Sequence, residues 1–416
     1  MRRAVLVLAV AAGALWLAPG AFAAGWCGSG ETTSDRTDIV TGRQIHAIVV
    51  DPADGPDTFA ADSGRIADDV ASLSSWWTAQ DPTRVPRFDL ANFGNAQCLD
   101  ISYLRLSVGG ASIVGAGAAF GDIIDALFAH GYSSPYKKYL VYYDGPSPER
   151  NVCGVGAGTF DTGPALAAVM LAGCPDVPSD LTATHELLHA LGAVPPGDPH
   201  ACPGDPGHPC DSTADVLYPT VHAGDQLSQK VLDYNHDDYY GHSGSWPDIQ
   251  DSLFLHRLDT PEEALAIALN GAGTVASDVP GVSCAASCTT QWDQGATVTL
   301  TATAGPNTRF VGWTGACTGV GSCFVALSTS LAATAQFGPL VIPLKVSVTG
   351  RGRVACTPAC TRTLRAGSAL TLRAVAEKGW RFAAWSGGCT GTRPTCSPST
   401  DYALSVRATF RRRGLG

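Results

Sequence analysis

The sequence predicts an α+β domain with a twisted sheet, followed by two small all-β domains. Apolar strand-like runs alternate with amphipathic helix-like segments up to Leu191, and the C-terminal part contains two stretches that repeat each other. Glycine (47 residues) and proline (27 residues) supply turns throughout. The chain has 416 residues, of which 15% are charged and 45% hydrophobic. These values predict two to four domains and exclude wholesale disorder.

The first 23 residues have the pattern of a secretory signal peptide. Arg2-Arg3 precede an apolar run over residues 4–18, and Ala21-Phe22-Ala23 form a small-x-small cleavage site. The apolar run is short for a membrane span, and no later segment is long and apolar enough to be one. We therefore expect a secreted, extracellular protein without a transmembrane anchor, either free or associated with the cell surface.

The spacing of apolar residues predicts the elements of the first domain. Amphipathic helices are expected over residues 63–80, around 123–128 and over 179–191. The third helix should be capped by Ser179 or Asp180 and should end at Gly192. The expected strands are the apolar runs 45–50, 99–106, 137–143 and 165–172.

The fourteen cysteines agree with export, because disulfides persist in oxidising compartments. Cys202 and Cys210 enclose a short Pro/Gly-rich loop, so we predict that they pair. Cys153–Cys174 and Cys27–Cys98 are two further predicted pairs. The eight remaining cysteines lie in the C-terminal part, where four per unit allow three connectivities, and the pairing there stays open.

The C-terminal part is an internal repeat. The residues Cys288, Trp313 and Cys317 each recur 72 residues later, as Cys360, Trp385 and Cys389. We place repeat 1 at residues 264–338 and repeat 2 at residues 339–416, each as a small β module. The units resemble the divergent B-repeat of internalin-type bacterial surface proteins, and this resemblance implies a β-grasp-like module appended to a secreted protein.

The net charge of −10 is unevenly distributed. Residues 1–263 carry −20, repeat 1 carries −1 and repeat 2 carries +11. This pattern excludes a uniform nucleic-acid binder and leaves an acidic body with a basic second repeat. We expect no nucleic-acid partner. The basic repeat could hold a monomeric protein on an anionic cell-envelope polymer, and a solvated face that aids solubility is the alternative.

The third predicted helix carries the motif HELLH at residues 185–189. Residues four apart lie on one face of a helix, so His185 and His189 can bind one Zn²⁺. The carboxylate of Glu186 lies beside the first ligand and can act as general base toward a metal-activated water. A buried helix whose histidines only pack is the alternative. The motif therefore predicts a zinc-dependent hydrolase.

The longer run through Gly192 resembles the metzincin clan of zinc peptidases, whose HExxHxxG pattern precedes a third His or Asp ligand. This resemblance implies a metzincin-like catalytic domain, here over residues 24–263, with an active-site helix beside the sheet. It also implies a secreted zinc metalloendopeptidase that cleaves protein or peptide substrates. The position usually taken by the third ligand is Pro195, which cannot bind a metal.

Three residues remain as candidates for the third metal ligand. We predict His200, because neutral imidazole is a common zinc ligand and Cys202 could anchor it beside a disulfide. Asp198 and then His208 are the alternatives, and each of the three could instead be a solvated loop residue.

Residues 215–219 (DVLYP) resemble the metzincin methionine turn, with Leu217 in the place of methionine. Tyr218 would follow as a catalytic residue that stabilises the oxyanion, or as a further metal ligand, and ordinary packing is its alternative. Separately, the carboxylates of Asp233, Asp237 and Asp238 could bind Ca²⁺. Their spacing differs from that of an EF-hand, and a hydrogen-bonded surface turn is the alternative.

Two functions are therefore compatible with the sequence. The first is a secreted zinc endopeptidase that uses Glu186 as general base. The second is a catalytically weak or inactive zinc-binding surface protein whose repeats mediate adhesion or envelope binding. Zinc content and peptide cleavage distinguish the two.

Overall fold

The structure is a computed structural model that describes residues 26–113, 115–147, 149 and 152–413. The chain divides after Thr260 into two compact units, which are treated separately below. The predicted signal peptide, residues 1–23, lies outside the described residues.

A five-stranded sheet forms the centre of the first unit, in the order β5-β1-β6-β8-β7. The first four of these strands run parallel, and β7 is antiparallel to β8 at one edge. The strands are β1 (Gln44–Asp51), β5 (Ile101–Arg105), β6 (Lys137–Tyr143), β7 (Gly154–Ala157) and β8 (Ala165–Met170). Short pairs flank the sheet: β2 (Arg84–Pro86) with β11 (Leu255–Arg257), β3 (Leu90–Phe93) with β4 (Ala96–Leu99), and β9 (Ala201–Cys202) with β10 (Asp205–Pro209).

Three α-helices cover the two faces of this sheet. Alternate residues of β1 point to opposite faces, as the two-residue period of a strand requires. Ala47 and Val49 belong to the core that contains α1 (Phe59–Gln80) and α3 (Ser179–Leu191), whereas Ile48 and Val50 join α2 (Ala116–Ala129) on the other side. Helix α3 packs against β8 and the edge strand β7. The sheet thus holds one face of α3 beside an edge strand.

The elements predicted for the first unit are present, with differences at their ends. Helix α1 begins at Phe59, ahead of the predicted residue 63, and the Asp57 carboxylate accepts the backbone N–H of Phe59 at 3.1 Å. The predicted strand 99–106 is interrupted at Asp100, whose N–H donates to Asp89 O.

The predicted caps of α3 are wrong at one end of the helix and confirmed at the other. The residue before the helix is Pro178, which has no capping side chain, and Asp180 lies inside the first turn, where its carboxylate accepts the N–H of Leu181 at 2.8 Å. Gly192 ends the helix in the left-handed region (φ 89°), and its N–H donates to His189 O at 3.0 Å.

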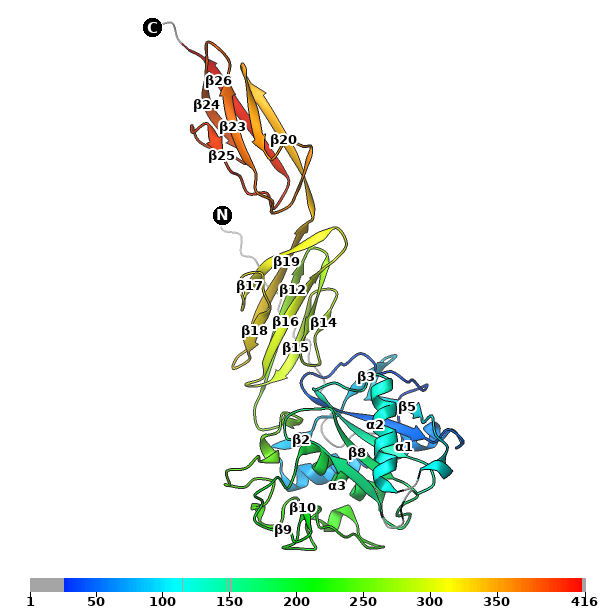
Figure 1. The fold of residues 1–416 in the computed structure, drawn as a ribbon. Coiled ribbons are helices and arrows are strands. Elements are labelled where there is room, and N and C mark those ends of the chain that lie inside the picture. The colour runs from blue at the N-terminus through cyan, green and yellow to red at the C-terminus, as the bar shows by residue number, and fades with distance from the viewer. Residues whose placement is uncertain (1–25, 114, 148, 150–151, 414–416) are drawn as a thin grey trace. The chain divides into compact units, whose positions relative to one another are not determined.

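The second unit consists of two β modules without a helix in residues 261–413, so the β-grasp-like form implied by the family resemblance is wrong. Each module packs two sheets around a buried tryptophan, Trp313 or Trp385. Figure 1 shows both modules as groups of long strands.

The sheets of the first module are β15-β12-β19-β17 and β14-β13-β16-β18. Their strands are β12 (Glu262–Asn270), β13 (Gly273–Ser277), β14 (Ser283–Cys284), β15 (Cys288–Asp293), β16 (Thr297–Ala304), β17 (Thr308–Gly315), β18 (Cys323–Ala326) and β19 (Leu331–Pro339). The sheets of the second module are β22-β20-β26-β24 and β21-β23-β25. Their strands are β20 (Val341–Thr349), β21 (Gly352–Thr357), β22 (Thr363–Arg365), β23 (Thr371–Ala376), β24 (Trp380–Gly387), β25 (Thr395–Cys396) and β26 (Leu404–Arg412).

The two modules repeat each other in detail, which confirms the internal repeat. The indole N–H of Trp313 donates to Gly321 O at 2.9 Å, and that of Trp385 donates to Arg393 O at 2.9 Å. The disulfides also match: Cys284–Cys288 and Cys317–Cys323 in the first module correspond to Cys356–Cys360 and Cys389–Cys396 in the second.

All fourteen cysteines lie in the described residues and form seven disulfides. The three predicted pairs, Cys27–Cys98, Cys153–Cys174 and Cys202–Cys210, are among them. This number of disulfides is consistent with an extracellular protein. None of the helices in the described part of the chain has the length and apolarity of a membrane span.

Candidate metal centre

Helix α3 presents His185 and His189 on one face, as the four-residue spacing predicts. Their Nε2 atoms lie 3.2 Å apart. Both rings are largely buried, and burial lowers the pKa of His185 to about 4 and that of His189 well below its usual value. Both imidazoles are therefore neutral near pH 7, which is the form that binds a metal.

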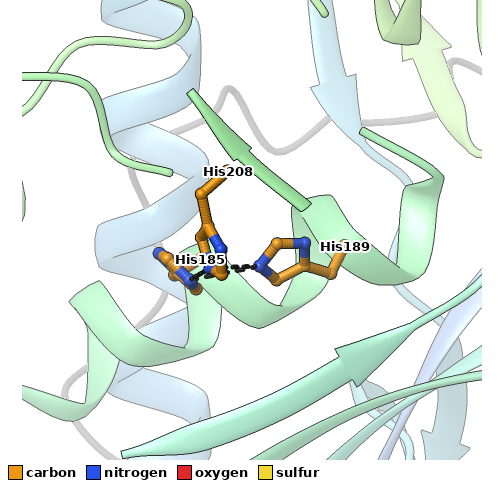
Figure 2. Close-up of side chains that lie close together, drawn as sticks. All are labelled: His185, His189 and His208. Atoms are coloured by element: carbon orange, nitrogen blue, oxygen red, sulfur yellow. Dashed lines mark hydrogen bonds between the residues drawn. The ribbon is translucent and has the colours of Figure 1, made fainter. Parts of the chain in front are cut away.

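A third imidazole, that of His208, completes the cluster. Its Nε2 lies 3.2 Å from Nε2 of His185 and 3.1 Å from Nε2 of His189. Figure 2 shows the three rings directed at one another, two from the helix and one from strand β10. These three residues form one of the groups in the described chain whose ligand atoms are close enough to share a metal ion.

Hydrogen bonds alone cannot link all three pairs of Nε2 atoms in the cluster, because His185 carries no proton on Nε2. Its Nδ1–H donates to Val216 O at 2.8 Å, so the neutral ring carries no proton on Nε2. Tetrahedral zinc with Zn–N bonds of about 2.05 Å would separate two nitrogens by about 3.3 Å, close to the distances observed here. The donor set and its spacing therefore fit Zn²⁺.

A disulfide-closed hairpin positions His208. Strands β9 and β10 pair Cys202 with Asp205 and Ala201 with Pro209, so the register shifts between Asp205 and Pro209. His208 lies in this irregular stretch, where a bulge can redirect a side chain. The Cys202–Cys210 disulfide joins the two ends of the hairpin. Asp205 Oδ1 lies 3.0 Å from Nδ1 of His208, on the ring edge away from the cluster.

The structure does not bring His200, the predicted third ligand, to the histidine cluster, and it places His208 there instead. His200 precedes the hairpin, and its Nδ1 bonds Asp238 Oδ1 at 2.7 Å instead of joining the histidine cluster. Asp198 is also outside the cluster, and its Oδ1 accepts the backbone N–H of His200 at 2.9 Å. The sequence contained the disulfide loop but no signal for the register shift that turns His208 inward.

Glu186 is buried beside the histidine cluster, under the edge strand β7. Burial raises the pKa of its carboxyl group to about 8. A Cβ atom on Gly154 would lie 2.6 Å from Oε1 of Glu186, and one on Gly156 would lie 3.0 Å from Oε2. The two glycines of β7 therefore leave the space that the carboxylate occupies. The alternation of glycine in GVGAG was the sequence signal for this contact, and it was missed.

The turn at residues 215–218 lies behind His185. Val216 supplies the carbonyl that accepts from this ring, and Leu217 is fully buried in the same core as α3. The Asp215 carboxylate fixes the turn, because it accepts the N–H of Leu217 at 2.7 Å and the hydroxyl of Tyr239 at 2.9 Å. Tyr218 follows with its side chain half-buried, and its N–H donates to Asp215 O. Its catalytic role stays a prediction.

Lys138 fixes the C-terminal end of α3. Its ammonium group donates to Ala190 O at 2.6 Å and to Thr159 O at 2.7 Å. This lysine belongs to β6, so the central sheet holds the end of the helix that follows His189. Lys138 thus anchors the C-terminal end of α3 to the sheet. Strand β7 packs along the side of the same helix.

A second polar cluster in the described chain brings together His200, Asp211, Asp237 and Asp238. Burial raises the pKa of Asp238 to about 7, a contact with the Asp198 carboxyl group adds to this, and the hydrogen bond from His200 opposes it. Asp233, the first residue of the predicted Ca²⁺ segment, instead accepts the backbone N–H groups of Tyr239 and Tyr240 at 2.7 and 2.5 Å.

Comparison with known families defines the class of the C-terminal part. Residues 272–338 and 342–414 each match the family model described as the divergent InlB B-repeat domain. The predicted B-repeat resemblance is therefore confirmed for these residues. A search of curated proteins found no significant match to the chain.

Two solved structures illustrate what is similar to the whole chain. One is wild-type OgpA from Akkermansia muciniphila, with 11% identity and a TM-score of 0.26 over 91% of this chain and 98% of that one. The other is catalytically inactive OgpA from the same organism in complex with an O-glycopeptide substrate, with 11% identity and a TM-score of 0.27 over 92% and 100% of the two chains. At these TM-scores neither likeness carries an argument about the fold or the site.

Proposed function

We propose that the chain is a secreted zinc-dependent endopeptidase with a metzincin-like catalytic domain. The observation that carries this proposal is the convergence of three imidazole Nε2 atoms within 3.1–3.2 Å, with the buried Glu186 next to the first of them in the chain. Three protein ligands and one open position are typical of catalytic zinc, whereas structural zinc usually has four protein ligands.

His185, His189 and His208 would hold the metal. Bound Zn²⁺ supplies Lewis acidity toward a carbonyl oxygen and lowers the pKa of water. One hydrogen bond orients a ligand ring, because Val216 O accepts from Nδ1 of His185. Contacts of this kind fix the tautomer and the direction of a metal-binding histidine.

Glu186 would act as the general base. Its carboxylate accepts a proton from the attacking water and returns it to the amine that leaves. A buried carboxyl group with a raised pKa suits both transfers, because a base is most effective when its pKa is close to the working pH. Tyr218 is a second candidate, as a residue that stabilises the oxyanion.

Strand β7 supports a peptide as the substrate. It lies at the end of the sheet order, pairs with β8 on one side, and carries small residues directly above Glu186. The backbone groups of its other edge can bind an extended peptide as an added strand. A peptide bound in this way would pass beside the histidine cluster, which favours cleavage within a chain over removal of terminal residues.

Removal and return of metal test the proposal on the chain from residue 24 onward. We expect about one zinc per molecule, loss of peptide cleavage after treatment with 1,10-phenanthroline, and recovery when Zn²⁺ is added. Metal analysis and a mixed library of peptides provide the two readouts. Bound zinc without cleavage would favour the alternative, an inactive zinc-binding surface protein. A chain that retains no zinc would contradict both.

A charged face favours an additional role for the second repeat. Its residues lie on the outer side of the sheet β22-β20-β26-β24, all exposed: Lys345, Arg365, Arg381, Arg407 and Arg411. The same register positions of the first repeat hold Ala266, Asp293, Arg309, Thr334 and Gly338. Since one scaffold exists with and without the charge, the β fold does not itself require it. The basic face could hold the protein on an anionic cell-envelope polymer.

Salt dependence checks this role. The triple variant Lys345→Gln, Arg407→Gln, Arg411→Gln should raise the apparent Kd for envelope polymer by about tenfold or more at 0.1 M salt. Binding of the unmodified chain should disappear toward 1 M salt, where the Debye length is about 3 Å. The matched control removes three charges elsewhere in the same repeat, by Arg353→Gln, Arg373→Gln and Arg393→Gln. Equal loss in both variants would show that net charge, not this face, governs binding.

A further inference from the structure

The second polar cluster lies at the base of the hairpin that carries His208. His200 immediately precedes β9, and Asp211 immediately follows Cys210, so both ends of the hairpin contribute to the cluster. Asp237 and Asp238 come from a separate loop, and one ligand atom from each of the four residues lies within 4.8 Å of the others. This cluster is distinct from the histidine triangle, with which it shares no residue.

Asp238 is the group in this cluster that most requires a cation. Its side chain is 0% exposed, and Oδ1 accepts from Nδ1 of His200 at 2.7 Å. Its other oxygen, Oδ2, is buried and has no hydrogen-bond partner among the described residues. A buried carboxylate oxygen without a hydrogen-bond donor is costly unless a proton or a cation neutralises it.

Two further carboxylate oxygens near Asp238 are also buried and lack a hydrogen-bond donor. Oδ2 of Asp198 and Oδ1 of Asp237 are buried without a hydrogen-bond partner in the described chain. The carboxyl group of Asp198 contacts that of Asp238, and this contact raises the pKa of Asp238, because a proton or a cation has to lie between two carboxylates at this distance. The single imidazole of His200 can offset at most one of these negative charges, so the local balance remains negative.

The backbone around the cluster is fixed before any ligand binds. The Asp233 carboxylate accepts the N–H groups of Asp238, Tyr239 and Tyr240 and thereby shapes the loop that carries Asp237 and Asp238. On the other side, the Cys202–Cys210 disulfide closes the hairpin next to Asp211. The oxygens are thus held in place by covalent and hydrogen-bonded supports that belong to the protein alone.

We propose that this cluster is a Ca²⁺ site formed by the carboxylates of Asp198, Asp211, Asp237 and Asp238. Ca²⁺ prefers oxygen ligands and tolerates irregular geometry, which suits four carboxylates from three separate segments. His200 then acts as a positioning residue, because its Nδ1–H donates to one oxygen of Asp238 and leaves the other for the cation. The ion would join the hairpin to the 233–240 loop.

A consequence for the first site rests on the proposed zinc function. Ca²⁺ at the base of the hairpin would restrict the motion of its far strand, where His208 lies. We therefore expect Ca²⁺ to slow the loss of zinc without binding at the histidine cluster. This effect is separate from Ca²⁺ binding itself, which does not depend on whether the chain is a peptidase.

Calorimetric titration of the zinc-loaded chain with CaCl₂ tests the site. We expect one site with a Kd of about 10⁻⁵–10⁻³ M. Asp238→Asn should raise that Kd at least about tenfold, and Asp237→Asn should do the same with less risk to folding, because the Asp237 side chain is 47% exposed. Asp176→Asn removes one exposed charge from the same unit as a control and should leave the Kd unchanged.

Several outcomes would overturn the proposal. The first is the absence of Ca²⁺ binding up to 10 mM, about ten times the weakest expected Kd. The second is an equal Kd for Ca²⁺ in the Asp237→Asn and Asp176→Asn variants. The third is binding of Zn²⁺ or Mn²⁺ but not of Ca²⁺. The rate of zinc transfer to 4-(2-pyridylazo)resorcinol, with and without CaCl₂, measures the consequence. A chain that binds Ca²⁺ but never binds zinc would refute the proposed peptidase and leave the Ca²⁺ site standing.

Discussion

Glu186→Gln is expected to lower kcat/KM for peptide cleavage by about 10³-fold or more while zinc content and fold stay unchanged. The amide has nearly the same shape as the carboxylate but cannot accept a proton from the attacking water, and general base catalysis contributes about 10²–10⁴-fold. The measurement is kcat/KM on a quenched peptide, with zinc quantified on the same sample. Glu31→Gln, at an exposed position, is the matched control. Activity within a few-fold of the unmodified chain would exclude Glu186 as the base.

The same substitution has a second readout in the zinc-free protein. Burial raises the pKa of Glu186 from 4.5 to about 8, so the folded state holds a proton that the unfolded state has lost between these values. The stability contributed by this group is therefore present below pH 4.5 and is lost as the pH rises toward 8. Glutamine has no such proton, so the difference in Tm between the variant and the unmodified chain should grow in favour of the variant from pH 5 to pH 8.

His208→Ala is expected to weaken zinc binding by about 10³-fold or more, whereas His200→Ala should change it little. Loss of a residue that only orients a ligand already costs about 10–100-fold in affinity, and a direct ligand should cost more. Competition with a chromophoric chelator gives both affinities. Far-UV circular dichroism and thiol titration of Cys202 and Cys210 confirm that the hairpin is intact. If His200→Ala releases zinc and His208→Ala retains it, the side chains rearrange in solution and the proposed site is wrong.

The features that depend on one element could be predicted from the sequence. The spacing of His185 and His189 determines that they share a helix face, and Gly192 ends that helix because its left-handed backbone conformation suits glycine. The four parallel strands of the central sheet were also predictable, since short apolar runs buried on both faces mark parallel strands, but the glycine-rich edge strand β7 was not predicted. The repeat was visible because the matched cysteines and tryptophans recur at a fixed interval.

The features that depend on tertiary contacts could not be predicted in the same way. His200 and His208 lie in one Pro/Gly-rich stretch, and only the register of the β9–β10 pair decides which of them reaches α3. Helix α3 begins one residue earlier than the expected cap requires, and the Asp180 carboxylate accepts both the N–H of Leu181 at 2.8 Å and the hydroxyl of Ser72 on α1 at 2.6 Å. In both cases the decisive partner lies on an element that the local sequence does not specify.

The disulfide of the hairpin encloses one member of the histidine triangle. Two corners of the histidine triangle lie on a helix that can form as soon as the sheet does, but the third lies inside the loop that Cys202–Cys210 closes. Without this disulfide, only the pairing of β9 with β10 would hold the hairpin closed around His208. Formation of the Cys202–Cys210 disulfide would therefore couple the proposed zinc site to the oxidation of one cysteine pair.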